Sequence, residues 1–239
     1  MEIRFFETLP STNRTAAEAA REGAVAFFTV WAKTQTAGRG RLDRSFHSPV
    51  GGTYFSTVLR PSLPRAQYTA LTPFAALAVR RALSELTGVQ ADIKWVNDLY
   101  VNGKKICGIL AEAGEDKEGA PFVILGIGIN TGKDLLPPEI ADIAANVPFD
   151  APRALIERIL THLKGAEAAI CEESWIAEYR AHCLWRGERV AVKTADAVCM
   201  ARMLEVEPDG ALFVEWENGA RERLYGGEIS LRSAQKGEI

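Results

Sequence analysis

Arginine and glycine alternate between residues 38 and 41, in a pattern that could hold an anion. The run reads Gly38-Arg39-Gly40-Arg41, and Arg44 follows it. Glycine lets backbone N–H groups approach a ligand closely, and arginine can donate two parallel hydrogen bonds to a phosphate or a carboxylate. The alternative is a mobile, solvated loop, and the motif alone leaves both interpretations open.

A second candidate group surrounds a predicted β-hairpin. Residues 94–98 read KWVND, and an Asn-Gly pair at 102–103, a strong signal for a tight hairpin turn, separates them from Lys105. The facing strands of this hairpin are expected to bring Lys94 and Asp98 near Lys105. The alternative is a hairpin with ordinary edge lysines, which oppose aggregation.

Lys105 opens an apolar strand, where lysine is rarely buried without a partner. Side chains alternate between the two faces of a strand. The alternation predicts that Lys105 shares a face with Cys107 and Ile109.

A third motif, Gly126-Ile-Gly128-Ile-Asn130, ends another apolar run. Glycine inside a strand indicates tight packing or close approach by another group. The motif lacks the third glycine and the following helix of a dinucleotide fingerprint, which excludes that interpretation. Asn130 could bond a base edge or cap the following loop.

The elements that must position these groups mix strands and helices. Ser11-Thr12-Asn13 offers three helix N-cap residues, and residues 33–52 form a long glycine-containing loop. Periodicity predicts an α/β (α+β) domain with a mixed sheet flanked by helices. The expected strands are 2–7, 25–32, 53–60, 91–96, 99–101, 105–113 and 121–130. The expected helices are a short one that follows Ser11-Thr12-Asn13 and ends at about 22, and those at 67–86, 151–170 and 172–183.

The pattern changes near residue 188, where short strands and turns begin. Asp209-Gly210 and Asn218-Gly219 are typical of hairpin turns. We therefore expect a first domain at 1–184 and a small all-β barrel at 185–239, with strands at 188–193, 198–207, 211–217 and 221–224.

Composition narrows the classes of protein. Of 239 residues, 47% are hydrophobic and 25% are charged, as in a soluble globular protein. The four cysteines include no Cys-x-x-Cys pair, which fits a reducing cytoplasm, and neither a secretory signal nor a membrane-length apolar run is present.

Charge is distributed unevenly along the chain. The net charge is −3, which disfavours nucleic-acid binding over the whole surface. Residues 33–44 nevertheless carry Lys33, Arg39, Arg41 and Arg44 against Asp43 alone. Such a local excess of positive charge is typical either of a site for an anionic ligand or of a solvated loop.

Taken in order, the motifs form a specific combination. Ser11-Thr12-Asn13, GRGR at 38–41, KWVND at 94–98, KKICGIL at 104–110 and GIGIN at 126–130 together resemble the biotin protein ligases. The resemblance covers about residues 1–183, and the C-terminal part looks like the SH3-like domain of that family.

The resemblance implies an ATP-dependent reaction in two steps. Biotin and ATP, with Mg²⁺, would give biotinyl-5′-AMP and pyrophosphate, and a lysine of a biotin carboxyl carrier protein would then displace AMP. Joining two anions requires positive charge and positioning. The catalytic positions implied are Lys105, Arg39, Arg41, Lys94 and Asp98.

The same resemblance implies binding roles, with no metal ligand among the side chains. The loop at 38–47 is expected to order over biotin and the adenylate. The positions implied for biotin are Ser11, Thr12, Asn13, Gln35, Gly38, Arg39, Arg41, Lys105 and Gly108, and those for ATP are Arg39, Arg41, Arg44, Phe46, Asn97, Lys105 and Asn130.

Two residues depart from the family pattern. Val96 stands where proline is usual, so the turn before Asn97 is expected to be less rigid, and Phe46 stands where tryptophan is common. Because the first expected strand begins at Glu2, we expect a monofunctional ligase that binds neither DNA nor membrane, with a homodimer possible. The alternatives are a lipoate or octanoate ligase or transferase of the same fold and a non-catalytic biotin- or carrier-binding module.

Overall fold

The computed structural model describes residues 1–41, 44–132, 136, 138–194, 197–226 and 230–233. Asp43 and the last residues of the expected C-terminal domain, 234–239, lie outside the described residues.

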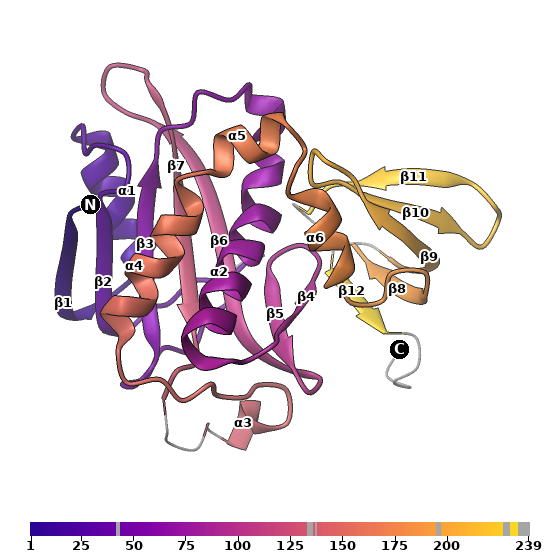
Figure 1. Ribbon diagram of the computed structural model, residues 1–239, viewed down its shortest axis with the longest axis horizontal. Coiled ribbons are helices and arrows are strands. Elements are labelled where there is room, and N and C mark those ends of the chain that lie inside the picture. Colours follow the sequence, from indigo (N-terminus) through magenta and orange to yellow (C-terminus); the bar gives the residue numbers. More distant parts are fainter. Residues whose placement is uncertain (42–43, 133–135, 137, 195–196, 227–229, 234–239) are drawn as a thin grey trace.

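A seven-stranded sheet organises the first part of the chain (Figure 1). Its order is β1-β2-β3-β7-β6-β5-β4; β1 and β2 run parallel, and the other neighbours are antiparallel. The predicted mixed sheet is therefore confirmed. The strands are β1 (Ile3–Leu9), β2 (Thr29–Gln35), β3 (Thr53–Leu59), β4 (Asp92–Lys94), β5 (Asp98–Val101), β6 (Lys104–Glu115) and β7 (Pro121–Ile129).

Helices cover both faces of this sheet. Ala16 and Ala20 of α1 pack on one face, and the almost wholly buried α2 packs on the other beside α4 (Figure 1). Alanine on α1 allows close approach to the sheet, whereas the larger apolar residues of α2 and α4 fill the main core. The helices are α1 (Thr12–Arg21), the 3₁₀ helix η1 (Arg65–Ala70), α2 (Leu71–Thr87), α3 (Pro138–Ala141), α4 (Pro152–Leu163), α5 (Ala166–Cys171) and α6 (Ile176–Ala181).

A second, antiparallel sheet lies beyond α6 and β4 (Figure 1). Its order is β11-β10-β9-β8-β12, and Gly210 and Gly219 adopt positive φ in the expected hairpin turns. The all-β character of the C-terminal part is confirmed. Its strands are β8 (Arg189–Lys193), β9 (Val198–Val206), β10 (Leu212–Trp216), β11 (Arg221–Leu224) and β12 (Ser230–Ser233).

The connection between the two sheets is short. The Leu184 amide donates to the Ile93 carbonyl in β4, whereas the Gly187 amide donates to the Met203 carbonyl in β9. These bonds support a boundary between 184 and 187, and we propose the division into 1–184 and 185–239 on this basis.

Some element boundaries differ from the sequence expectation. The strand expected at 25–32 begins only at Thr29, because Phe28 closes a turn onto the Val25 carbonyl and Phe27 has φ 64°. The helix expected at 151–170 is two helices, since Gly165, a poor helix former, lies between α4 and α5.

Three other segments are less regular than expected. The helix expected at 67–86 starts as the 3₁₀ helix η1, and only part of 172–183 is helical, as α6. The strand expected at 91–96 ends at Lys94 and is followed by a cis Trp95–Val96 peptide bond. Within the described ranges, no helix is both long and apolar enough to cross a bilayer.

Candidate active site

The floor of the site forms where strand β7 changes from large residues to glycine. Phe122 and Ile124 pack in the small core under α1, and Gly126 and Gly128 follow on the same face. A Cβ atom on Gly126 would lie 1.8 Å from Asn13 Oδ1, and one on Gly128 would lie 2.5 Å from a Phe46 ring carbon. The glycines therefore admit these side chains, as the motif predicts.

Gly108 on β6 continues this floor opposite Gly128. A Cβ atom on Gly108 would lie 2.9 Å from the Phe46 ring and 3.1 Å from Lys105 Nζ. The Phe46 ring thus lies across two strands, with the Lys105 ammonium 5.9 Å from its centre.

A cavity of about 160 Å³ opens over the floor. Its lining includes every predicted site residue except Gly38 and Asn130, and also Trp95 and, from the C-terminal sheet, Leu231. The roles assigned to these residues stay predictions. A neighbouring cleft of about 440 Å³ shares Arg39 and Arg41 with this cavity.

One end of the cavity is built from uncharged, buried polar groups, which we call the amide–hydroxyl end. Gln35 Oε1 accepts from the Thr12 amide at 2.8 Å and from the Thr12 hydroxyl at 3.1 Å. The Ser56 hydroxyl lies 2.7 Å from Thr12 Oγ1 and 2.6 Å from Asn13 Oδ1. Gln35 Nε2 donates to Ser48 Oγ at 2.9 Å.

The expected N-cap residues serve this end of the cavity. Ser11 is the N-cap of α1, yet its side chain makes no capping hydrogen bond. The side chains of Thr12 and Asn13 bond Gln35, Ser56 and other groups of the site instead. A motif that predicts a helix start therefore also supplies polar groups to the cavity.

The other end of the cavity carries charged groups, and we call it the cationic end. Lys105 Nζ lies 2.6 Å from Asp98 Oδ1, so the predicted approach of these two residues is confirmed. The predicted face of Lys105 is wrong. The register places Leu99 opposite Cys107 but Tyr100 opposite Lys105, so Ile106 is an extra residue of a β-bulge.

The bulge explains why Lys105 is available to the cavity. An extra residue reverses the side-chain alternation, which moves Lys105 from the face of Cys107 to that of Gly108. Cys107 remains fully buried in the main core.

Arg41 joins three parts of the chain. Its Nη1 donates to Asn97 Oδ1 at 3.0 Å, and its Nη2 donates to the carbonyl oxygen of Gly226, in the C-terminal part. Burial lowers the pKa of the Arg41 guanidinium, and the nearby Asp98 carboxylate opposes this shift. Asn97 and Gly226 thus position the partly buried guanidinium.

Arg39 pairs with a carboxylate that the sequence analysis did not identify. Its Nη1 lies 3.0 Å from Glu112 Oε1, while Glu112 Oε2 accepts from Asn13 Nδ2 at 2.7 Å. Glu112 therefore connects the cationic end to the amide–hydroxyl end.

Backbone hydrogen bonds join the two sides of the described part of the glycine-arginine loop. The Gly40 amide donates to the Arg44 carbonyl at 2.7 Å, and the Phe46 amide donates to the Gly38 carbonyl at 2.9 Å. Gly38 itself packs closely against the Phe46 carbonyl oxygen and the Ser48 hydroxyl. Residues 42–43 of this loop lie outside the described part of the chain.

Three predicted residues lie at the margin of this arrangement. The Lys94 ammonium is 5.5 Å from the Tyr100 ring centre and 5.4 Å from that of Trp185. Asn130 lies outside the cavity lining, and its side-chain Nδ2 donates to the Ala145 carbonyl at 3.2 Å. Lys33, part of the positive cluster, pairs with Glu7 at 3.0 Å.

The sequence analysis missed Ser48, Ser56 and Glu112. For Ser56 the sequence offers one signal, a polar residue inside a predicted strand. The structure shows that this residue is fully buried. No local signal distinguishes Glu112, whose partners lie far away in the sequence. Among the described residues, no three His, Cys, Asp or Glu side chains gather to hold a metal ion.

Residues 5–130 match the model of the biotin/lipoate A/B protein ligase family. The chain belongs to this family. Its resemblance to the biotin protein ligases and its assignment as a ligase are thereby confirmed, together with the fold class.

Individual relatives agree with this placement. The ligase is 34% identical to the bifunctional ligase/repressor BirA of Bacillus subtilis over 244 aligned residues, which cover 95% of this chain and 73% of the relative. It is 32% identical to the biotin–[acetyl-CoA-carboxylase] ligase of Mycobacterium tuberculosis over 203 residues, which cover 77% and 71%.

A solved structure extends the similarity to the whole chain. The biotin protein ligase from Aquifex aeolicus in complex with biotin and ATP has a TM-score of 0.81 and 27% sequence identity. The match covers 98% of this ligase and 99% of that chain, so it includes the C-terminal sheet.

Proposed function

We propose that the chain activates biotin with ATP and transfers it to one lysine of a biotin carboxyl carrier protein. The observation that carries this proposal is one cavity lined both by the uncharged groups of the amide–hydroxyl end and by the cations Arg39, Arg41 and Lys105. The names of the relatives, which include biotin and the carboxylase, support the same substrate and carrier.

The amide–hydroxyl end suits the head group of biotin. A ureido ring needs both donors and acceptors, and hydroxyl and amide side chains supply both. Thr12, Asn13 and Gln35 provide such groups without a net charge, and Ser11 lies beside them in the lining. Gly108 leaves room for the ligand to pack against the sheet.

In the first step, a carboxylate oxygen of biotin attacks the α-phosphorus of ATP. The bond from this phosphorus to the bridging oxygen breaks, and pyrophosphate leaves with the electron pair. Lys105, Arg39 and Arg41 reduce the repulsion between the two anions, and preformed charges cost little reorganisation during the reaction. Mg²⁺ would arrive on the triphosphate oxygens and neutralise charge there.

In the second step, the neutral amine of the carrier lysine attacks the carbonyl carbon of biotinyl-5′-AMP. AMP leaves with the electrons of the anhydride bond, and the amine loses a proton. Lys105 would stabilise the oxygen that gains charge, and Asp98, which pairs with Lys105, would orient the amine. Closure of the loop at 38–47 would keep water from the anhydride.

Biotin-dependent exchange of pyrophosphate into ATP tests the first step. We expect exchange by the wild type and, in Lys105→Ala, a loss of about a thousandfold, the scale found for removal of one group that stabilises developing charge. Lys104→Ala is the matched control, because Lys104 Nζ donates to the Ala141 carbonyl instead of facing Asp98.

Each other outcome would contradict a different part of the proposal. Exchange with lipoate but not with biotin would assign the chain to the lipoate ligases. Exchange with neither acid would leave a binding module. Equal losses in Lys104→Ala and Lys105→Ala would remove the role given to Lys105.

Transfer to an isolated biotin carboxyl carrier protein tests the second step. Mass spectrometry should show one biotinyl group, and replacement of the carrier lysine by arginine should abolish it. Modification at several lysines would contradict specific transfer. Cytoplasmic location, dimer formation and the absence of DNA binding stay predictions of the sequence analysis.

A further inference from the structure

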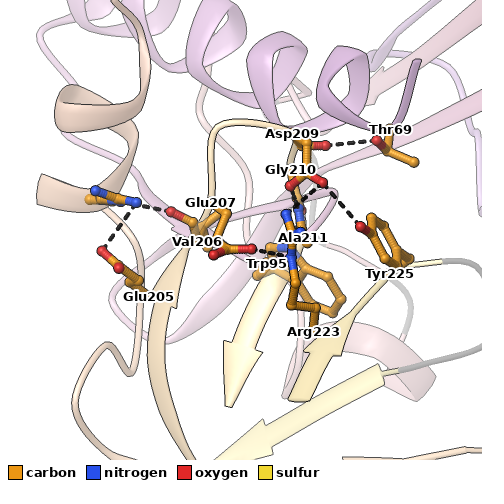
Figure 2. Close-up of polar contacts among 11 residues, drawn as sticks. Thr69, Trp95, Glu205, Val206, Glu207, Asp209, Gly210, Ala211, Arg223 and Tyr225 are labelled. Carbon is orange, nitrogen blue, oxygen red and sulfur yellow. Dashed lines mark hydrogen bonds and ion pairs between the residues drawn. The ribbon is translucent and has the colours of Figure 1, made fainter. Parts of the chain in front are cut away.

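The turn between β9 and β10 of the C-terminal sheet rests against the first part of the chain (Figure 2). Thr69 Oγ1 donates to the Asp209 carbonyl at 2.7 Å, and Trp95 Nε1 donates to the Gly210 carbonyl at 3.0 Å. Gly210 has φ +86°, and a Cβ atom there would lie 2.8 Å from the Thr69 carbonyl oxygen. Only glycine fits this contact without displacement.

Trp95 connects this turn to the cationic end. Its side chain is buried, and its indole N–H bonds the Gly210 carbonyl, so removal of the bond would leave a buried acceptor unpaired. Two residues later, Asn97 accepts from Arg41 Nη1 and its backbone carbonyl accepts from the Ile109 amide at 2.9 Å. The next residue, Asp98, holds Lys105.

A second path runs from the same turn to Arg41. The Asp209 carboxylate accepts from Arg223 Nη2 at 2.9 Å and from the Tyr225 hydroxyl at 3.0 Å (Figure 2). Gly226 follows Tyr225, and its carbonyl accepts from Arg41 Nη2. A Cβ atom on Gly226 would lie 2.6 Å from a Val96 methyl carbon, so this segment also packs on the turn of the KWVND motif.

Another contact of the same sheet does not reach the cavity. Arg180 of α6 donates from Nε to the Val206 carbonyl at 2.6 Å, and its Nη2 lies 3.1 Å from Glu205 Oε2. Arg180 attaches the C-terminal sheet at a point outside the cavity lining. A variant of Arg180 would therefore weaken the attachment of the C-terminal sheet without acting directly on the reactive groups.

We propose that Trp95 and the Asp209–Gly210 turn are positioning groups for the adenylation step. The C-terminal sheet fixes residues 95–98 through the Trp95 indole and fixes Arg41 through Gly226. It thereby sets where Arg41 and Lys105 stand toward the phosphates. This inference rests on the proposed function, because the groups positioned are those assigned to biotin activation.

Two pairs of variants test positioning against attachment. Trp95→Phe keeps an aromatic ring and removes the indole N–H, and Arg180→Met removes an attachment of similar size. Gly210→Ala introduces a Cβ atom against Thr69, whereas Gly219→Ala places one at a similar positive φ with nothing within 4 Å. Thermal unfolding of all four measures the stability effect shared by each pair.

Three measurements are made on the full chain. These are kcat and KM for ATP in biotin-dependent exchange, the biotin Kd by calorimetry, and hydrogen exchange of the Ile109 amide by NMR. We expect Trp95→Phe and Gly210→Ala to lower kcat/KM for ATP about tenfold, since small misplacements of reacting groups are costly. The Ile109 amide should exchange faster in both, while the biotin Kd stays within about twofold, because the amide–hydroxyl end does not touch the turn.

The controls decide the outcome. Arg180→Met and Gly219→Ala should leave kcat/KM and Ile109 exchange at wild-type values. Unchanged Ile109 exchange in Trp95→Phe, or an equal loss of kcat/KM in Arg180→Met, would overturn the proposal. A wild type without biotin-dependent exchange would overturn the proposed function instead, and Ile109 exchange would still test the positioning.

Discussion

The two ends of the cavity are held together in different ways. At the amide–hydroxyl end, Thr12 and Asn13 of α1 and Ser56 of β3 are at most 5% exposed, and the Ser56 hydroxyl bonds both of the others. At the cationic end, the side chains of Arg39 and Lys105 are 53% and 31% exposed and pair with carboxylates.

The difference follows from the energetics of charge. Uncharged polar groups can be buried in advance when each finds a hydrogen-bond partner. A cation that is only partly withdrawn from water is stabilised by an opposite charge, and Asp98 and Glu112 supply one to Lys105 and Arg39. We infer that the first end is preformed, whereas the second exchanges partners when the ligand binds.

The largest effect expected on ligand affinity comes from two glycines of β7, one beside each end of the cavity. Gly126→Ala would force Asn13 out of its place, and we expect biotin to bind about a hundredfold more weakly, equal to about 3 kcal/mol. Gly128→Ala would displace the Phe46 ring instead, so KM for ATP should rise more than the biotin Kd. Calorimetry and exchange kinetics on both variants give the two quantities. The same pattern in both would show that the ends act as one unit.

A smaller effect tests the hydrogen-bond chain at the amide–hydroxyl end. Ser56→Ala removes the hydroxyl between Thr12 and Asn13, and unpaired buried polar atoms cost about 1–3 kcal/mol. We expect the biotin Kd to rise about tenfold, with kcat almost unchanged.

Thr57→Val is the matched control for Ser56→Ala. It removes a buried hydroxyl that bonds Thr29 from the next position of the same strand, on the other face. Thermal unfolding should show a similar loss of stability in both variants. A similar loss of biotin affinity in Thr57→Val would mean that Ser56 acts through stability alone.

The same difference explains how much of the molecule the sequence could predict. Periodicity located the strands of the central sheet and most helices, and the glycine motif on β7 correctly indicated close approach. Lys105 was predicted to lie beside Asp98, but on the wrong face, because a β-bulge adds one residue to the pairing and leaves no mark in the hydrophobic pattern.

The long-range contacts that support the cationic end could not be predicted from the sequence. Arg41 and Gly226 are 185 residues apart, and Trp95 and Gly210 are 115 apart. Only folding brings these groups together, and no periodicity or local motif encodes their pairing. At the amide–hydroxyl end, Ser11, Thr12 and Asn13 are consecutive and form one local motif, whereas their distant partner Ser56 was missed.

The smallest expected effect concerns Glu112, which joins the two ends. Glu112→Gln should still accept from Asn13 Nδ2 through its amide oxygen, but it removes the charge that holds Arg39. A half-exposed ion pair contributes little, so we expect KM for ATP to fall about two- to threefold as Arg39 becomes available, while the biotin Kd stays unchanged. Glu112→Ala removes both bonds and should also weaken biotin binding.

Glu115→Gln is the matched control, since Glu115 lies on the same strand and pairs with Arg65 outside the cavity lining. It should leave both constants unchanged. A higher KM for ATP in Glu112→Gln would show that Glu112 places Arg39 for the nucleotide instead of restraining it. The cationic end would then be preformed like the amide–hydroxyl end, and the contrast between them would reduce to charge alone.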